Sequence, residues 1–126
     1  MPRTVLIVED SEGTATALEI ALNAINGMHV LILTSAREAL KLLLSDPGEF
    51  AALITDIHMP YMDGFALIEE VRRHQCHSKL PILVISGDSH PDTPGRSLRL
   101  GADAYFCKPY SPSEIRHTLE GLLNAS

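Results

Sequence analysis

The stretch Ala51-Ala52-Leu53-Ile54-Thr55-Asp56 joins a short apolar run to a carboxylate, and the same pattern recurs along the chain. A short apolar run without helical spacing is typical of a strand that is buried on both faces, as in a parallel sheet. We therefore interpret this stretch as a central strand that ends at a polar residue. The other runs of this kind are Val5–Val8, Val30–Leu33, Ile82–Ile85 and, more weakly, Ala104–Cys107.

Amphipathic segments separate these apolar runs. Their apolar residues recur at the spacing of one helical face, which predicts helices that pack against a sheet. Alternation of strand and helix, repeated about five times, predicts an α/β fold with a parallel sheet and right-handed crossovers. The apolar stripes are Ala15/Leu18/Leu22/Ile25, Ala36/Ala39/Leu40/Leu43/Leu44, Phe65/Ile68/Val71 and Ile115/Leu119/Leu122.

Capping residues predict where some of these helices begin. Ser35, with Glu38 three residues later, indicates the start of the second helix. Ser111, followed by a proline and an early acid, indicates the start of the last one. The fourth helix should be short, because prolines and glycines between Ser86 and Gly101 leave only Arg96–Leu100 free to be helical.

Length and composition exclude several classes of protein. The 126 residues fit a single domain, residues 1–126. A formal net charge of −6 disfavours direct binding to nucleic acid or to an anionic membrane, and no apolar stretch has the length of a membrane span. The two cysteines, Cys76 and Cys107, do not suggest a disulfide scaffold. We therefore expect a cytoplasmic protein in which Cys107 packs as a small apolar side chain.

Polar residues follow four of the five apolar runs. Glu9 and Asp10 follow the first run, Asp56 the third, Ser86 the fourth and Lys108 the fifth. In open parallel sheets, ligands bind beyond the carboxyl ends of the strands. These five side chains should therefore meet at one edge of the sheet.

The chemistry of this set predicts a metal site that faces a phosphoryl site. Gathered carboxylates repel one another, and a hard cation such as Mg²⁺ relieves the repulsion; Mn²⁺ could substitute. Asp56 would bind the metal through one oxygen and attack phosphorus with the other. Lys108 would bring positive charge to the phosphoryl oxygens, and Ser86 a hydroxyl hydrogen bond. Positioning and charge neutralisation would then carry the transfer.

Four stretches together resemble the response regulator receiver family, and the resemblance covers essentially the whole chain. It implies a five-stranded parallel sheet in the order 2-1-3-4-5, a flavodoxin-like, doubly wound, three-layer sandwich. The matching stretches are Val8-Glu9-Asp10-Ser11, Thr55-Asp56-Ile57-His58-Met59-Pro60-Tyr61-Met62-Asp63-Gly64, Ile85-Ser86-Gly87 and Gly101-Ala102-Asp103-Ala104-Tyr105-Phe106-Cys107-Lys108-Pro109.

The resemblance also implies a role for each site residue. Asp10 and Asp56 would bind Mg²⁺ directly, Glu9 would act through a metal-bound water, and the backbone carbonyl of His58 would be a further ligand. Tyr105 matches the aromatic switch residue, which turns inward when Ser86 moves toward the phosphoryl group. The peptide bond between Lys108 and Pro109 would be cis.

A receiver is a phosphoacceptor switch that catalyses only its own phosphorylation and autodephosphorylation. The resemblance therefore implies that a histidine kinase or a histidine phosphotransfer protein supplies the phosphoryl group to Asp56. The surface made by the fourth helix, the fifth strand and the fifth helix would then control an output domain or a partner protein. The same surface could form a homodimer.

Three other functions compete with this interpretation. A flavodoxin-like FMN protein would need an uncharged loop after the first strand, where Glu9 and Asp10 stand. An aspartyl phosphohydrolase typically has a second acid two residues after its nucleophile, where this chain has His58. A degenerate receiver that signals by binding alone would not need the full residue set.

His74, Cys76 and His77 could bind zinc, but a structural zinc site needs four ligands.

Overall fold

Five parallel strands form one sheet in the order β2-β1-β3-β4-β5, as predicted. The computed structural model describes residues 3–124. The strands are β1 (Thr4–Val8), β2 (His29–Leu33), β3 (Phe50–Asp56), β4 (Ile82–Ser86) and β5 (Ala104–Cys107). The helices are α1 (Glu12–Asn23), α2 (Ala36–Ser45), α3 (Gly64–Arg73), α4 (Thr93–Leu100) and α5 (Pro112–Asn124), with a short 3-10 helix η1 (Gln75–His77) after α3.

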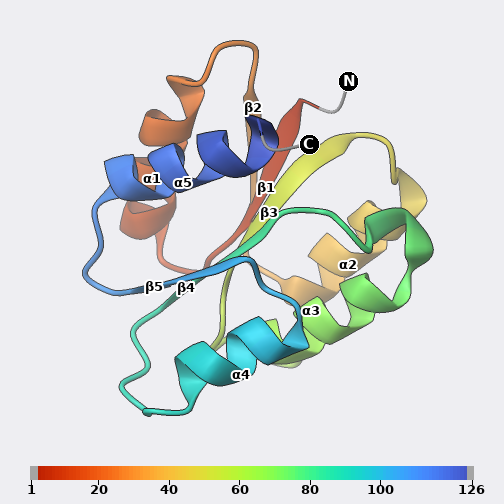
Figure 1. The fold of residues 1–126 in the computed structure, drawn as a ribbon, viewed down its shortest axis with the longest axis vertical. Coiled ribbons are helices and arrows are strands. Elements are labelled where there is room, and N and C mark those ends of the chain that lie inside the picture. Colours follow the sequence, from red (N-terminus) through yellow and green to blue (C-terminus); the bar gives the residue numbers. More distant parts are fainter. Residues whose placement is uncertain (1–2, 125–126) are drawn as a thin grey trace.

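The helices cover both faces of the sheet, which gives the predicted three-layer sandwich. Figure 1 shows α1 and α5 together on one face and α2, α3 and α4 on the other. Side chains of β1 alternate between the two resulting cores. Leu6 and Val8 pack in the core beneath α2 and α3, whereas Val5 and Ile7 pack in the core beneath α1 and α5.

The expected burial on both faces is correct for the three central strands and wrong for the two edge strands. Every residue of β1, β3 and β4 is buried, whereas β2 and β5 are only partly buried. An edge strand has a neighbour on one side only, so its residues are less completely covered. For the same reason Cys107, at the end of β5, is exposed and does not pack as a buried apolar side chain.

Two helix starts show which of the sequence predictions hold. The Ser35 hydroxyl accepts a hydrogen bond from the Glu38 amide at 3.2 Å, which confirms the predicted cap of α2. The predicted start of the fourth helix was wrong, because α4 begins at Thr93 rather than at Arg96. Pro94 lies in the first turn, where a backbone N–H has no partner within the helix and its loss costs little.

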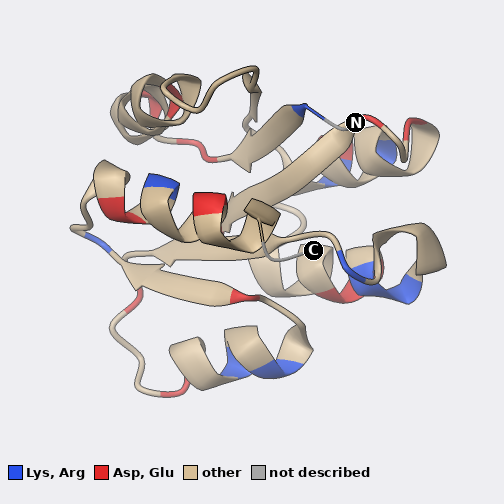
Figure 2. Cartoon of the chain, turned by 45° about the horizontal axis from the view of Figure 1, so that its top comes forward, with Lys and Arg blue, Asp and Glu red and all other residues tan. Residues whose placement is uncertain are grey.

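Charge is almost absent from the strands. Within the five strands that the structure describes, Asp56 is the one residue with a formally charged side chain, and it stands at the end of β3. Figure 2 shows the other charged residues on helices and loops. Over residues 3–124, no helix is both long and apolar enough to span a membrane.

Gly64 allows α3 to begin directly against the end of β3. Its amide donates a hydrogen bond to the Ile57 carbonyl at 2.8 Å. A Cβ atom at this position would overlap the carbonyl oxygen of Asp56 and lie 2.9 Å from the Ile57 Cα. Both obstacles are backbone atoms, which cannot rotate away as a flexible side chain could. The Asp63 side chain caps the same helix by accepting from the Ala66 amide at 2.8 Å.

Replacing Gly64 should therefore destabilise the fold. We expect Gly64→Ala to lower the free energy of unfolding by about 2 kcal/mol or more, because the added methyl group overpacks against backbone. Urea denaturation followed by circular dichroism measures this change. Gly121→Ala is the matched control: no heavy atom lies within 4 Å of its added Cβ, so alanine should stabilise α5 by about 0.5–1 kcal/mol. Equal effects of the two substitutions would contradict the steric argument.

Candidate functional site

The carboxyl ends of four adjacent strands bring the predicted site residues to one edge of the sheet. Glu9 and Asp10 follow β1, Asp56 ends β3, Ser86 ends β4 and Lys108 follows β5. These strands are neighbours in the sheet, so their ends converge. The structure therefore places these residues at a single edge of the sheet, as expected.

Three carboxylates form the centre of the site. Ligand atoms of Glu9, Asp10 and Asp56 all lie within 4.8 Å of one another. Glu9 and Asp56 are buried, whereas Asp10 is exposed. Oxygen donors gathered in this way suit a hard divalent cation such as Mg²⁺.

Lys108 is the cation that the chain itself supplies to this cluster. Its Nζ donates to Glu9 Oε2 at 2.9 Å and to Asp56 Oδ2 at 2.8 Å. One ammonium and three carboxylates give the cluster a formal charge of −2. A divalent cation would balance that charge, so the donor set fits such an ion.

The pKa values of Glu9 and of the partly buried Lys108 are both raised. Burial raises the pKa of the Glu9 carboxyl, and the nearby Asp56 charge adds to this effect; hydrogen bonds from Lys108 and from the Ser11 amide oppose it. Burial alone would lower the pKa of the Lys108 ammonium, but its hydrogen bonds to Asp56 and Glu9 raise it overall. Lys108 is therefore charged at neutral pH.

Both carboxylate oxygens of Asp56 are engaged. Oδ1 accepts the Ile57 amide at 2.6 Å, and Oδ2 accepts Lys108. The side chain thus has a fixed orientation at the end of β3, and its exposed fraction is only 9%.

Ser86 and Tyr105 are both connected to Asp88. Ser86 is fully buried, and its Oγ accepts the Asp88 amide at 2.9 Å. The hydroxyl of Tyr105, whose pKa burial raises, lies 3.5 Å from the Asp88 carbonyl. The Lys108–Pro109 bond is cis, as the resemblance implied. The switch roles of Ser86 and Tyr105 stay predictions.

Asp88 itself was missed by the sequence analysis. It accepts the His58 Nε2 at 2.8 Å, so the loop after β4 reaches across to the loop after β3. Hydrogen bonds from the His90 amide and the His58 ring hold the pKa of Asp88 below its usual value. The only available indication in the sequence was a carboxylate two residues after Ser86. The metal-ligand role of the His58 carbonyl stays a prediction.

The zinc alternative finds no support in the described part of the chain. His77 is buried, and its Nε2 contacts the Leu43 carbonyl at 2.8 Å, whereas Cys76 is exposed. Among residues 3–124, the carboxylate cluster is the one group of side chains with the geometry of a metal site.

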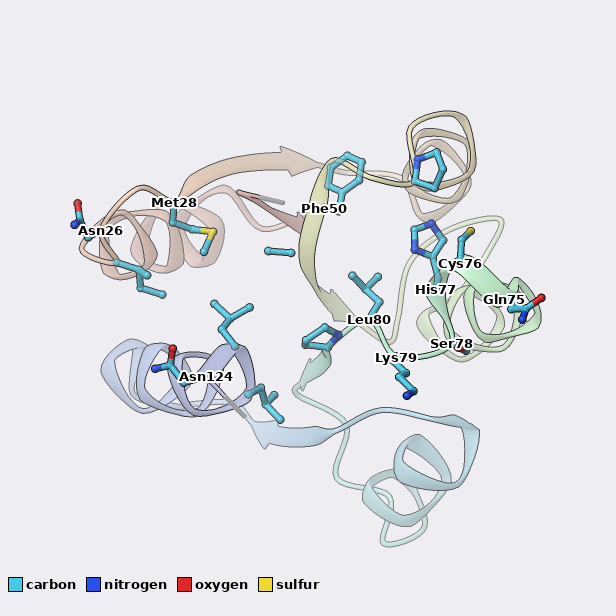
Figure 3. Close-up of a pocket in the computed structure, with 16 residues that line it drawn as sticks. Asn26, Met28, Phe50, Gln75, Cys76, His77, Ser78, Lys79, Leu80 and Asn124 are labelled. Atoms are coloured by element: carbon cyan, nitrogen blue, oxygen red, sulfur yellow. The ribbon is translucent and has the colours of Figure 1, made fainter. Parts of the chain in front are cut away.

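A hollow lies at the end of the sheet opposite the carboxylate cluster. It has a volume of about 720 Å³, and Figure 3 shows Phe50, Leu80 and the Asn124 end of α5 among the residues that surround it. Its lining contains no acidic residue and none of the predicted site residues. This hollow therefore offers none of the carboxylate donors that gather at the other end of the sheet.

Comparisons with known proteins agree with this geometry. The family model described as response regulator receiver domain matches residues 5–120. The two-component response regulator ORR11 of Oryza sativa subsp. indica is 30% identical over 97% of this chain and 82% of its own length. The PhoP regulator of alkaline phosphatase synthesis in Bacillus subtilis is 28% identical over 100% of this chain, which spans only 50% of that relative.

Solved structures show the same architecture. A putative response regulator from Chloroflexus aurantiacus superposes with a TM-score of 0.87 at 31% identity, covering 98% of this chain and 99% of that one. The Vibrio cholerae chemotaxis protein CheY4 gives a TM-score of 0.83 at 26% identity, with coverage of 97% and 99%. Fold, motifs and similarity over nearly the full length agree, and the chain therefore belongs to the response regulator receiver family.

Proposed function

We propose that this chain is a phosphorylation switch that accepts a phosphoryl group on Asp56. The observation that carries the proposal is the position of the Asp56 carboxylate. It lies between the Lys108 ammonium at 2.8 Å and two further carboxylates within 4.8 Å. A nucleophilic carboxylate, a fixed cation and a set of metal-ligand oxygens are the parts that phosphoryl transfer requires.

Each residue has a distinct task in this proposal. Asp56 attacks phosphorus with one carboxylate oxygen as the bond from phosphorus to the donor's imidazole nitrogen breaks and the donor histidine leaves, while Lys108 neutralises charge on the phosphoryl oxygens. Asp10, Asp56 and the His58 carbonyl would hold Mg²⁺ or Mn²⁺ directly, and Glu9 would act through a water. A bound divalent cation supplies the charge that makes attack by one anion on another feasible. Ser86 turns toward the phosphoryl group, and Tyr105 turns inward after it.

The partners follow from the family. A histidine kinase or a histidine phosphotransfer protein donates the phosphoryl group in the cytoplasm. The surface of α4, β5 and α5 then controls an output domain or a separate protein, and it could also pair two copies of the chain. The relatives PhoP and QseB are named transcriptional regulatory proteins, and the chain spans about half of their length. With a net charge of −6, this domain leaves any contact with DNA to another part.

Residues at the carboxylate edge of the sheet also argue against the competing functions. A flavodoxin-like site would place an FMN phosphate against Glu9, Asp10 and Asp56, which would repel it. A phosphohydrolase would need an acid where His58 stands, and the His58 side chain is paired with Asp88 instead. In our proposal the chain acts only on its own aspartyl phosphate. The presence of all the residues that phosphoryl transfer requires argues against a degenerate receiver that signals by binding alone.

Phosphorylation by a small donor tests the proposal directly. Incubation with acetyl phosphate and Mg²⁺ should add one phosphoryl group, measured by intact-mass spectrometry. Asp56→Asn should abolish the added mass, because an amide is a poor nucleophile. Chelation of the metal should do the same, because the carboxylate cluster then repels the donor.

Asp63→Asn is the matched control for that experiment. It changes an exposed carboxylate of the neighbouring loop to its amide, and asparagine is an equally good helix cap. We expect this variant to be phosphorylated like the unmodified chain. Stable phosphorylation of the Asp56→Asn protein would contradict the assignment of the acceptor.

Charge repulsion in the carboxylate cluster gives a second prediction. Asp10→Asn should raise the stability of the metal-free protein by about 1 kcal/mol, because it removes one of three clustered negative charges. The same variant should lose most of the stabilisation that added Mg²⁺ gives to the unmodified chain. Urea denaturation in EDTA and in Mg²⁺ measures both effects.

Asp46→Asn is the control for the second prediction, because Asp46 is an exposed carboxylate at the end of α2. It should leave the response to Mg²⁺ unchanged. If Asp10→Asn destabilises the metal-free protein and still responds fully to Mg²⁺, Asp10 is not a metal ligand.

A further inference from the structure

Asp88 is the centre of a hydrogen-bond network that the proposed phosphorylation chemistry does not require. Its Oδ2 accepts the Thr93 hydroxyl at 3.0 Å as well as the His58 ring nitrogen at 2.8 Å. Its Oδ1 accepts the His90 amide at 2.7 Å, and its own amide donates to the Ser86 hydroxyl oxygen. One carboxylate therefore joins the loop after β3, the loop after β4 and the first residue of α4.

The contact with His58 crosses the mouth of the site. His58 stands two residues after the acceptor Asp56, on a different loop from Asp88. Its side chain is 67% exposed, so packing does not hold it in place. The hydrogen bond to Asp88 is therefore the interaction that fixes the ring across the opening.

The inner surface of α4 is unusually polar. Its two buried residues are Thr93 and Ser97, whereas α3 buries Phe65, Leu67 and Val71 among others. Ser97 donates to the Thr93 carbonyl within the helix and so provides no link to the sheet. Little apolar surface holds the first turn of α4 in place. Its side-chain contacts with neighbouring elements include the Thr93–Asp88 hydrogen bond and the Arg96 guanidinium, which lies 4.0 Å from the ring centroid of Phe65 in α3.

The other end of α4 is attached more firmly. The Arg72 guanidinium donates to the Gly101 carbonyl at 2.7 and 3.0 Å and to the His77 carbonyl at 2.8 Å. It also pairs with Asp103, whose carboxylate accepts the Ile82 amide at the start of β4. The last turn of α4 is thus tied to α3 and, through Asp103, to the sheet by several charge-assisted hydrogen bonds.

We propose that His58, Asp88 and Thr93 form a latch that holds the first turn of α4 in its resting position, and that the Arg72 end serves as the hinge. The latch joins the mouth of the site to the helix through a single carboxylate. Ser86 shares this connection through the Asp88 amide. A change at Asp56 that displaces His58 or turns Ser86 would release the first turn while the last turn stays attached. These three residues act by positioning and take no part in bond formation.

Hydrogen exchange in the unphosphorylated, metal-free protein tests the latch, so its failure is separate from failure of the proposed phosphorylation. The reporting amides are those of the first turn, including the Arg96 amide that donates to the Asp92 carbonyl. His58→Ala removes only the contact across the mouth, and Thr93→Val removes only the hydroxyl. Each substitution should speed exchange of the Arg96 amide roughly tenfold, because it removes one hydrogen bond to a charged group.

The double variant distinguishes a connected latch from two separate contacts. His58 and Thr93 act through the same Asp88 oxygen, so the double variant should exchange no faster than the faster single variant. If the two contacts were independent, their effects on the exchange rate would multiply to roughly a hundredfold in the double variant. The Gly101 and Ala102 amides at the hinge should keep their rates in all three proteins. His117→Ala, which alters an exposed histidine of α5, should change none of these amides.

Three results would overturn the proposal. One is an Arg96 exchange rate in His58→Ala within about twofold of the unmodified chain. The second is multiplication of the two single effects in the double variant. The third is faster exchange throughout the sheet in a variant, because it would indicate global destabilisation.

Discussion

The imbalance between one ammonium and three carboxylates dominates this molecule. Like charges a few ångströms apart oppose folding, and burial of Glu9 increases that cost. The chain tolerates the imbalance because Lys108 bridges two of the acids and because oxygen donors of this kind can hold a cation. A domain built for stability alone would not gather these residues. Their presence together at the end of an otherwise uncharged sheet is consistent with the phosphorylation switch that we propose.

The parallel sheet makes that gathering possible. Each strand contributes an apolar segment that is dictated by burial and then one polar residue where the strand leaves the core. Strand order places the ends of β1, β3, β4 and β5 side by side, so residues far apart in sequence become neighbours. Lys108 and Glu9 lie 99 positions apart along the chain, and their side chains are in contact. The core thus determines where the site lies, and the residues at its edge determine what the site can do.

The fold and the meeting of the polar strand-end residues at one edge could be predicted because both follow from local patterns. Apolar runs indicated the strands, and the polar residue after each run indicated the site. The error at α4 arose because Pro94 was treated as an obstacle, although a first turn accommodates proline. The burial of β5 was overestimated because an apolar run does not reveal whether its strand lies at an edge. The contact between His58 and Asp88 depends on the conformations of two loops, which periodicity does not determine.

The junction at Gly64 has an evolutionary consequence. The loop that follows Asp56 returns so closely that Gly64 lies against the backbone of Asp56 and Ile57. A side chain at position 64 would overlap these backbone atoms. Tyr61, near the middle of this loop, is 97% exposed with φ of 70°, so the identity of its side chain is under little packing constraint. Descendants of this gene should therefore vary in side-chain size at the tip of the loop but favour residues that tolerate a left-handed backbone, such as glycine and asparagine, while natural selection removes insertions and deletions there.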